Sequence, residues 1–346
     1  MPEVVDSSNP KGQKETSDLE ARGVFPFAAG RSGSDAGCSM TLPSDTKVAV
    51  IIPTYNRWPY VCDAIDSVLG QTHKWTECIV VDDASSDGSC RRIREKYGES
   101  VSVISNPKNR EKSYCRNLGV KSCEAKFVCF LDSDDILTQN SVESRLEILL
   151  KEESVVSYGI TQRFNQTEEE ALRHFRSRVN GELPLVEQYL AHQGFLTTDG
   201  FMISRDNMIM HGMYSEALTN MEDVELFLRL LCSLEFRSCR TIVAKTRRID
   251  RSAQARLDKV IKQRFGLTER IRMNPMVMER IGKGFEKMQL SEYEKFLGAL
   301  YHAKQYRSYR RYYRQGLKCN LTPATLKFFK RYLLSYLRIP AEEQQL

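Results

Sequence analysis

The sequence predicts an α/β protein with a mostly parallel central sheet, on the strength of three observations. Apolar runs of strand length recur between residues 47 and 131, and amphipathic stretches of helix length separate them. This alternation is typical of a parallel sheet that helices cover on both faces. Polar clusters directly follow three of the apolar runs. Because ligands of such sheets bind beyond the carboxyl ends of the strands, we expect the site there.

The elements can be placed in order along the chain. The expected strands are residues 48–52, 78–81, 101–104, 127–131, 155–160 and 201–203. The expected helices lie near residues 58–70, 86–97, 112–123 and 183–191. Another helix is expected at Thr219-x-x-Glu222, a capping-box pattern, because apolar residues then repeat at helical spacing up to Leu231. From about residue 255 the pattern is helical, with interruptions expected at Gly282-Lys-Gly284 and Thr322-Pro323.

These patterns divide the 346 residues into three parts. Residues 1–46 have little apolar content and are predicted to be a disordered leader. Residues 47–254 are predicted to form the α/β domain, and residues 255–346 a helical basic region. The ten cysteines include no Cys-x-x-Cys pair, which indicates reduced thiols in an intracellular protein. No apolar run reaches 18 residues, so neither a cleavable signal nor a membrane span is expected.

Positive charge gathers at the C-terminal end. Residues 301–346 contain ten Lys or Arg and two Glu, a net charge of +8, whereas the whole chain carries +6. Aromatic side chains alternate with the basic ones, as in Tyr306-Arg-Ser-Tyr-Arg-Arg-Tyr-Tyr-Arg314. The stretch 301–338 could bind an anionic membrane surface, or it could pack its aromatic side chains against the rest of the protein. Nucleic acid is not an expected partner, because no RNA-binding signature accompanies the charge.

The most informative segment is the apolar run 127–131, which ends in Asp132-Ser-Asp-Asp135. If the chain stays extended, Asp132 and Asp134 point the same way, and charges about 4 Å apart repel by about 1 kcal/mol even in water. Mg²⁺ or Mn²⁺ would turn this repulsion into coordination. The alternative is that these acids cap the next helix. Asn140-x-x-Glu143 weakens it, since that pattern already offers a capping-box start.

Five motifs in order resemble those of the family 2 glycosyltransferases, which have the GT-A fold. They are Ile51-Ile-Pro-Thr-Tyr-Asn-Arg57, Ile65-Asp-Ser-Val-Leu-Gly-Gln-Thr72, Val80-Val-Asp-Asp-Ala-Ser-Ser-Asp-Gly88, Arg116-Asn-Leu-Gly119 and Phe130-Leu-Asp-Ser-Asp-Asp135. Further on, Glu222-Asp223 is similar to the acidic pair that supplies the family's catalytic base. The resemblance covers about residues 47–250. It implies a Rossmann-like sandwich with a nucleotide-sugar-binding half, residues 47–151, and an acceptor half, residues 152–254.

The resemblance also implies a role for each donor-site residue. Asp134 is favoured as the direct metal ligand, Asp132 could be a ligand or face the ribose, and Asp135 could be a ligand or support one. Arg116 resembles the cation that meets the nucleotide or its phosphates, the alternative being an exposed helix arginine. Asp83 resembles the acceptor of a hydrogen bond from the base; the alternative is a turn aspartate. Pro53, Thr54 and Tyr55 would form the adjoining wall.

For the transfer itself, the resemblance implies that Asp223 takes the proton of an acceptor hydroxyl, which attacks the sugar opposite the departing diphosphate. The outcome would be inversion. Glu222 is the alternative base. Alternatively, Asp223 could be a carboxylate that only interacts favourably with the N-terminus of a helix.

Three departures from the family pattern affect these expectations. Ala84 and Glu111 stand where glycine is common, and Thr246-Arg-Arg-Ile-Asp-Arg-Ser252 lacks a histidine that is common near the end of the catalytic domain. A third metal ligand therefore cannot be named from the sequence. Arg247 or Arg248 could contact the diphosphate.

Together these features predict a glycosyltransferase that needs Mn²⁺ or Mg²⁺. It would move a sugar from a nucleotide-diphosphate donor to a hydroxyl of a glycan or lipid-linked acceptor, as in the synthesis of cell-envelope polysaccharides. The expected location is the cytoplasm or the inner face of a membrane. The alternatives are a degenerate nucleotide-sugar-binding protein and a sugar-nucleotide pyrophosphorylase. The latter would need a glycine-rich phosphate loop, and residues 53–57 contain no glycine.

Overall fold

The computed structural model describes residues 46–151, 155–181, 183–191, 194–247, 266–318 and 328–337. The expected leader lies outside these residues except for Thr46. The expected domain boundary at residue 254 and the expected interruption at Thr322-Pro323 also lie outside the described residues. None of the helices in the described part of the chain is long and apolar enough to cross a membrane.

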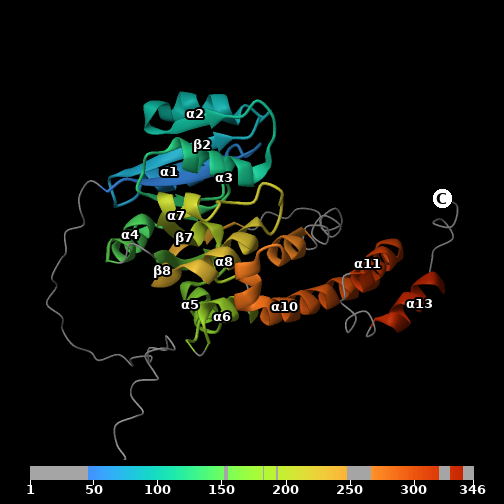
Figure 1. Ribbon diagram of the computed structural model, residues 1–346. Helices are drawn as coiled ribbons and strands as arrows, with labels where there is room; N and C mark the ends of the chain where they lie inside the picture. The colour runs from blue at the N-terminus through green and yellow to red at the C-terminus, as the bar shows by residue number, and fades with distance from the viewer. Residues whose placement is uncertain are drawn as a thin grey trace, which may run out of the picture. The chain divides into compact units, whose positions relative to one another are not determined.

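One curled sheet of eight strands forms the centre of the domain (Figure 1). The strands are β1 Val48–Thr54, β2 Thr76–Asp82, β3 Ser102–Ser105, β4 Phe127–Phe130, β5 Ile136–Leu137, β6 Val155–Arg163, β7 Phe201–Ser204 and β8 Glu235–Thr246. Their order is β3-β2-β1-β4-β7-β6-β8-β5. Strands β3, β2, β1 and β4 are parallel, as are β6 and β8, whereas β7 is antiparallel to both its neighbours. The predicted α/β class with a mostly parallel sheet is confirmed.

Helices cover both faces of this sheet, as the alternation of side chains along β1 requires. The α-helices are α1 Tyr60–Leu69, α2 Ser89–Tyr97, α3 Glu111–Ser122, α4 Ser141–Lys151, α5 Glu168–Arg176, α6 Leu185–Ala191, α7 Arg205–Met210, α8 Glu222–Ser233, α10 Pro275–His302, α11 Tyr306–Lys318 and α13 Phe329–Leu337. Val48, Val50 and Ile52 pack in one core with α1 and α4. Ala49 and Ile51 pack in the other with α3 and α8.

Among the described residues, two helices and two strands were absent from the sequence-based expectation: α5, α7, the two-residue strand β5 and the long strand β8. Charged and polar residues make up much of β8, whose side chains are largely exposed or half-buried. Its strand conformation comes from pairing with β6, from Val155 opposite Glu235 to Arg163 opposite Thr246. A partner so distant in the sequence leaves no local signal, because β propensity depends strongly on packing context.

Two local expectations were wrong. Helix α8 has no capping box at Thr219, because Met221 is its N-cap residue, in the left-handed conformation and without a side-chain cap. Helix α10 runs unbroken through Gly282 and Gly284. A Cβ at Gly284 would lie 3.0 Å from Leu190 of α6, so the glycine allows close packing of the two helices and does not end α10.

The C-terminal helices use their aromatic side chains for packing. Val277, Ile281 and Phe285 of α10 belong to the main core. A second cluster joins α10, α11 and the start of α13 and consists of Tyr293, Leu297, Leu300, Tyr309, Tyr312, Tyr313 and Phe328. Tyr309 donates to the Phe328 carbonyl at 3.0 Å. The sequence left two expectations for this region, membrane binding and packing against the protein. Packing accounts for most of its tyrosines.

The two positions where the family commonly has glycine require an unusual backbone. Ala84 follows β2 with φ 63°, and Glu111 begins α3 with φ 67°. Both values lie in the left-handed region, which costs a residue with a side chain about 1–2 kcal/mol. At both positions the chain therefore adopts a left-handed backbone conformation that glycine would adopt at lower cost.

Ala84→Gly should raise the free energy of unfolding by about 0.5–1 kcal/mol, because relief of the left-handed strain exceeds the entropy that glycine adds to the unfolded chain. Urea unfolding of the purified protein measures this. Ala299→Gly, at an exposed position inside α10, is the matched control and should lower stability by about 1 kcal/mol. Equal losses of stability in the two variants would mean that the left-handed conformation of Ala84 is not strained.

Candidate active site

The polar clusters meet at the carboxyl edge of the parallel strands, as expected. Asp83, just after β2, is buried. Its carboxylate accepts hydrogen bonds from the side-chain amide of Asn106 at 2.8 Å and from the backbone N–H groups of Arg110 and Glu111 at 2.8–3.0 Å. Asp83 thus holds the loop that leads into α3. Its contact with a nucleotide base stays a prediction.

The segment after β1 offers a surface beside Asp83. Pro53 and Thr54 are buried as the last residues of β1, while Tyr55 is 47% exposed. Asn56 ties this loop to the loop after β2, since its side-chain oxygen accepts from the backbone N–H groups of Ser86 and Asp87 at 2.8 and 3.2 Å. Of the expected wall, Tyr55 is the residue whose side chain is open to a ligand.

Arg116 is not an exposed helix residue but the centre of the site. Its side chain is 1% exposed. One end of the guanidinium donates to Asp132 at 2.5 Å, the other to Glu222 at 3.0 Å, and the group lies 4.9 Å from the centre of the Tyr214 ring. Burial opposes its charge, but the carboxylate of Asp132 raises the pKa of Arg116 above its ordinary value. The residue is therefore a permanent cation between two acids.

Helix α3 also secures the loop before α8. The Ser113 hydroxyl donates to the Leu218 carbonyl at 3.1 Å. Asn117 donates to the Tyr214 carbonyl at 2.9 Å and accepts from the Tyr214 N–H at 3.0 Å. Arg116 and Asn117, one motif in the sequence, thus connect α3 to the start of α8 and to the loop before it.

The acidic segment differs in geometry from the expected extended strand. The chain turns after Leu131, with the Asp135 N–H donating to the Asp132 carbonyl at 3.0 Å. This turn ends the two-residue alternation that would have aligned Asp132 with Asp134. The Asp134 carboxylate lies 3.7 Å from Arg57. Asp132 and Asp135 instead lie near a third acid, Asp199.

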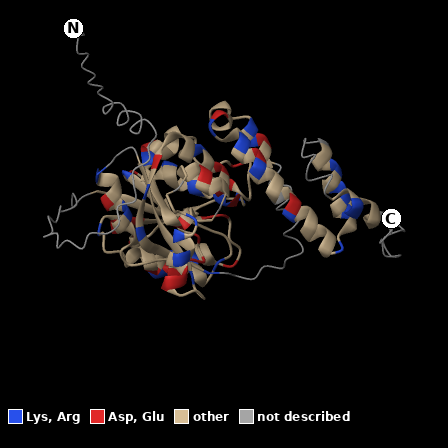
Figure 2. Cartoon of the chain, turned by 90° about the horizontal axis from the view of Figure 1, so that it is seen from below, with Lys and Arg blue, Asp and Glu red and all other residues tan. Residues whose placement is uncertain are grey.

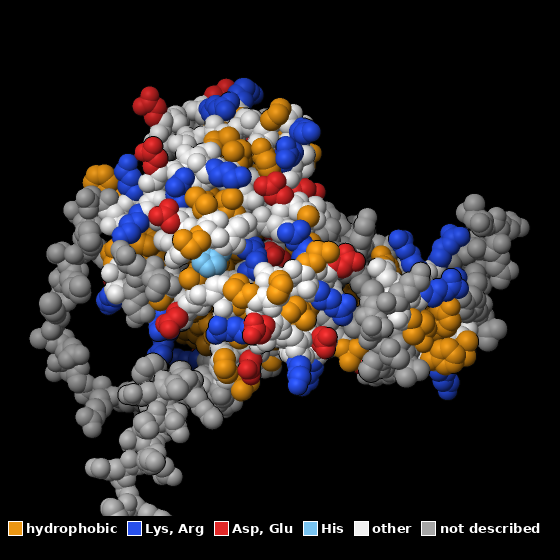
Figure 3. All heavy atoms as spheres, in the orientation of Figure 1, with side chains coloured by type: hydrophobic (Ala, Val, Ile, Leu, Met, Phe, Trp, Pro, Cys, Tyr) orange, Lys and Arg blue, Asp and Glu red, His pale blue; other side chains and the backbone are white. Residues whose placement is uncertain are grey.

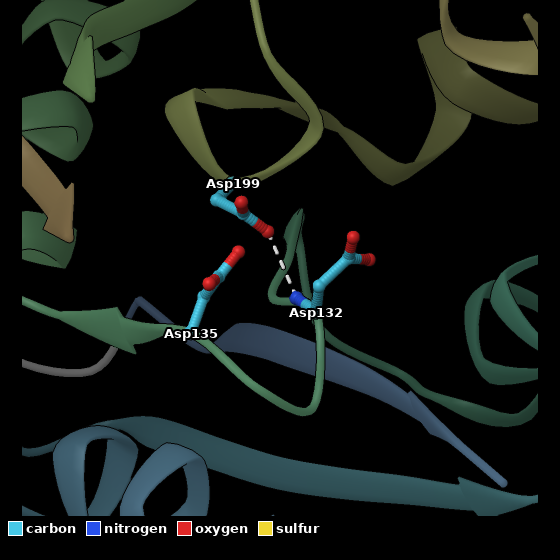
Figure 4. A group of neighbouring side chains, drawn as sticks. All are labelled: Asp132, Asp135 and Asp199. Atoms are coloured by element: carbon cyan, nitrogen blue, oxygen red, sulfur yellow. Dashed lines mark hydrogen bonds between the residues drawn. The ribbon is translucent and has the colours of Figure 1, made fainter. Parts of the chain in front are cut away.

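Figure 4 shows this group: the carboxylates of Asp135 and Asp199 turn toward each other, and a hydrogen bond joins Asp199 to the backbone of Asp132. One carboxylate oxygen from each of the three residues lies within 4.8 Å of the others. Burial and neighbouring carboxylates raise the pKa of Asp135 to about 9 and that of Asp199 to about 7. An all-carboxylate set of this kind fits Mg²⁺ or Mn²⁺.

Glu222 and Asp223 differ sharply although they are adjacent. Glu222 is 1% exposed, and one of its oxygens accepts from both Lys112, at 2.5 Å, and Arg116. Burial works against its charge, but these two cations lower its pKa. Asp223 is half-buried, and its carboxylate accepts from the Val224 N–H at 2.9 Å. Burial and the charge of Glu222 raise its pKa. Glu222 is therefore a poor proton acceptor and Asp223 a better one.

Arg247 approaches the acidic group through its backbone. Its N–H donates to Asp135 at 2.6 Å. Its side chain pairs with Asp63 of α1 at 3.0 Å and lies over the rings of Tyr60 and Phe164 at 4.9 and 4.8 Å. Its side chain is thus paired with Asp63 of α1, and Arg248 lies outside the described residues.

Sequence reasoning missed Asp199 and Lys112. Asp199 lies in a short 3₁₀ turn, Thr198–Gly200, with no neighbouring motif. Lys112 could have been found, because it lies four residues before Arg116 and so on the same face of α3.

The comparisons with known proteins agree with this geometry. Residues 49–211 match the family model "Glycosyl transferase family 2". The chain therefore contains a family 2 glycosyltransferase domain. An uncharacterized glycosyltransferase of Rickettsia felis is 36% identical to it over 122 residues, which are 35% of this chain and 20% of that protein. WfgD of Escherichia coli, a UDP-Glc:alpha-D-GlcNAc-diphosphoundecaprenol beta-1,3-glucosyltransferase, is 33% identical over 115 residues, 33% of this chain and 46% of WfgD.

The fold of the glycosyltransferase domain is also that of a solved structure. S. aureus TarS 1–349 in complex with UDP-GlcNAc superposes with a TM-score of 0.57 and 19% identity, covering 83% of this chain and 89% of that one. This likeness establishes the GT-A fold. The matching segments span less than half the length of these two curated relatives.

Arg116→Met should lower the free energy of unfolding by about 3–5 kcal/mol, because it leaves the buried Glu222 with Lys112 as its remaining cation. The matched control is Arg91→Met, which removes an exposed pair with Glu95 and should cost less than about 1 kcal/mol. Urea unfolding of both variants measures the two losses in free energy of unfolding. Equal effects would mean that the buried bridge is no more important than a surface pair.

Proposed function

We propose that this protein is a metal-dependent, inverting glycosyltransferase. It moves a sugar from a nucleotide-diphosphate donor to a hydroxyl of a glycan or lipid-linked acceptor. The observation that carries the proposal is the bridge from Asp132 through Arg116 to Glu222. This bridge links Asp132 of the acidic group to Glu222, the residue that precedes Asp223 at the start of α8.

The donor is proposed from the site and from the fold. Tyr55 is open beside the loop that Asp83 holds, and this surface suits a nucleotide base. TarS, which shares the fold, has been crystallised with UDP and with UDP-GlcNAc. By analogy, a uridine-diphosphate sugar is the first donor to test.

The carboxylates of Asp132, Asp135 and Asp199 are the residues that would hold Mn²⁺ or Mg²⁺, and Asp134, which lies 3.7 Å from Arg57, is a further candidate ligand. A bound cation would neutralise the charge that develops on the leaving diphosphate. The protein's own part is to keep these acids together, through the turn at Asp132–Asp135 and the hydrogen bond from Asp132 to Asp199.

Asp223 is the proposed base. It would accept the proton of the acceptor hydroxyl, whose oxygen then attacks the sugar from the side opposite the diphosphate, so the anomeric configuration inverts. Its raised pKa makes it a stronger proton acceptor than an exposed aspartate. Glu222 supports this role by fixing the start of α8 against Lys112 and Arg116.

For the acceptor, the name of WfgD provides an analogy, because it describes transfer to a diphosphoundecaprenol-linked sugar. We extend this to a lipid-linked or glycan acceptor in cell-envelope polysaccharide synthesis. Such an acceptor would place the enzyme in the cytoplasm at the inner face of a membrane.

Asp223→Asn should reduce kcat at least 1000-fold with little change in the dissociation constant for UDP-sugar, because the amide cannot take a proton. Turnover assays with a panel of UDP-sugars and acceptors, together with calorimetry, separate the two effects. In the wild type, activity should fall as the pH drops through the raised pKa of Asp223. Asp206→Asn, at an exposed position on α7, is the control. Undiminished turnover by the Asp223 variant would remove this residue from the mechanism.

Asp199→Asn should weaken Mn²⁺ binding at least tenfold, since it removes one of three carboxylates. Metal binding requires the ionised acids. The pKa values of Asp199 and Asp135, about 7 and 9, are raised, so wild-type affinity should increase between pH 7 and pH 9. Titration calorimetry with Mn²⁺ alone measures both effects. Unchanged affinity in the variant would exclude Asp199 as a ligand.

A further inference from the structure

The helices nearest the C-terminus combine a single sign of charge with an exposed apolar face. Between residues 301 and 337 the sequence has nine Lys or Arg and no Asp or Glu. In Figure 2 the Lys and Arg positions on the C-terminal helices are coloured blue. Nothing in the proposed transfer uses them, because the donor and base residues all lie between residues 53 and 223.

Most of the aromatic side chains of this region are unavailable to a partner. Tyr309, Tyr312 and Tyr313 of α11 are buried against α10 and α13, and Tyr313 stacks on Tyr332 with ring centres 4.3 Å apart. These contacts fix α13 to α11. Arg310 adds a hydrogen bond to the Ser335 carbonyl at 2.8 Å.

Three large apolar side chains of these two helices remain exposed, Leu317 on α11 and Phe329 and Leu333 on α13, and we call them the apolar patch. Their exposed fractions are 46%, 49% and 51%. Phe329 and Leu333 are four residues apart on α13 and so lie on one face of that helix. In Figure 3 hydrophobic side chains gather over this part of the chain, with Lys and Arg beside them. The exposed basic residues nearest in sequence are Lys330 on α13 and Arg311 and Arg314 on α11.

We propose that this apolar patch and its basic neighbours form a docking surface for a bilayer that contains anionic lipid. We choose this partner because the positive charge of the Lys and Arg side chains complements the negative charge of anionic lipid headgroups. Large apolar side chains can enter the boundary between headgroups and acyl chains, while Lys and Arg beside them pair with lipid phosphates. A peptide partner would instead call for a groove with directed hydrogen bonds, whereas Phe329 and Leu333 lie exposed on one face of a single helix.

The buried tyrosine cluster gives the surface its rigidity. Because α11 and α13 are packed together before any lipid is met, docking requires little ordering of the chain. Helix α10 in turn packs in the main core through Val277, Ile281 and Phe285. The docking surface is thereby connected to the catalytic domain, and it goes beyond the proposed transfer because lipid binding needs no turnover.

The test is flotation of the full-length protein with vesicles of phosphatidylglycerol and phosphatidylcholine in equal parts, against phosphatidylcholine alone. The wild type should bind the anionic vesicles, and binding should weaken as salt increases. The double variant Phe329→Ser/Leu333→Ser should bind at least tenfold more weakly. Its control, Met210→Ser/Met273→Ser, removes two side chains that are 76% and 80% exposed elsewhere and should bind like the wild type.

Charge is tested in the same way. Arg311→Gln/Lys330→Gln should weaken binding by about fivefold for each residue, whereas Lys74→Gln/Lys121→Gln, at exposed positions in the other part of the protein, should have a much smaller effect. Far-ultraviolet circular dichroism shows that each variant is folded. UDP-sugar binding should be unchanged in all of them, so failure of the proposed function and failure of this proposal can be told apart.

Three results would overturn the proposal. They are equal binding to both kinds of vesicle, unchanged binding by the Phe329/Leu333 variant, and no vesicle binding by a wild type that forms dimers which this variant dissociates. The last result would make the patch an interface between two copies of the chain.

Discussion

The site depends on one buried cation. Arg116 lies where three parts of the chain meet: the end of β4 through Asp132, the start of α8 through Glu222, and the ring of Tyr214. A guanidinium suits this position because it stays charged when buried and can donate in two directions at once. Removing it would leave the buried Glu222 with Lys112 as its remaining cation, and loss of one member of a buried ion pair is costly.

The rest of the site follows from this bridge. Helix α3, which carries Arg116, is itself placed by Asp83, whose carboxylate accepts the N–H groups of Arg110 and Glu111 at its beginning. Strained residues mark the same loops, with positive φ at Ala84, Glu111 and Met221. Strain of this kind persists only where surrounding contacts compensate for it. Here those contacts also bring the acidic turn and the start of α8 together.

The C-terminal region shows how one composition can support two roles. Its alternating aromatic and basic residues were compatible with packing or with a membrane, and the structure divides them by side chain. Tyrosines face inward and hold the helices together, whereas Leu317, Phe329, Leu333 and many of the basic side chains face solvent. Helical periodicity is the reason, since residues a turn apart share a face while their neighbours point elsewhere.

The sequence by itself determined the fold class, most of the elements and the family, because these depend on local apolar periodicity and on motifs of adjacent residues. It also placed Asp132 and Asp135 directly after a strand and Asp223 at the start of a helix. Strand β8 could not be predicted, since its conformation comes from pairing with β6.

The composition of the acidic group was decided by the tertiary structure alone. The turn at Asp132–Asp135 replaced the expected alignment of Asp132 with Asp134, and it brought in Asp199 from 67 residues away. The tertiary structure also causes the difference in pKa between Glu222 and Asp223, because Lys112 and Arg116 reach Glu222 from α3. Contacts between residues so far apart in sequence arise only when the chain has folded, and they determine which carboxylates are ionised and which can accept a proton.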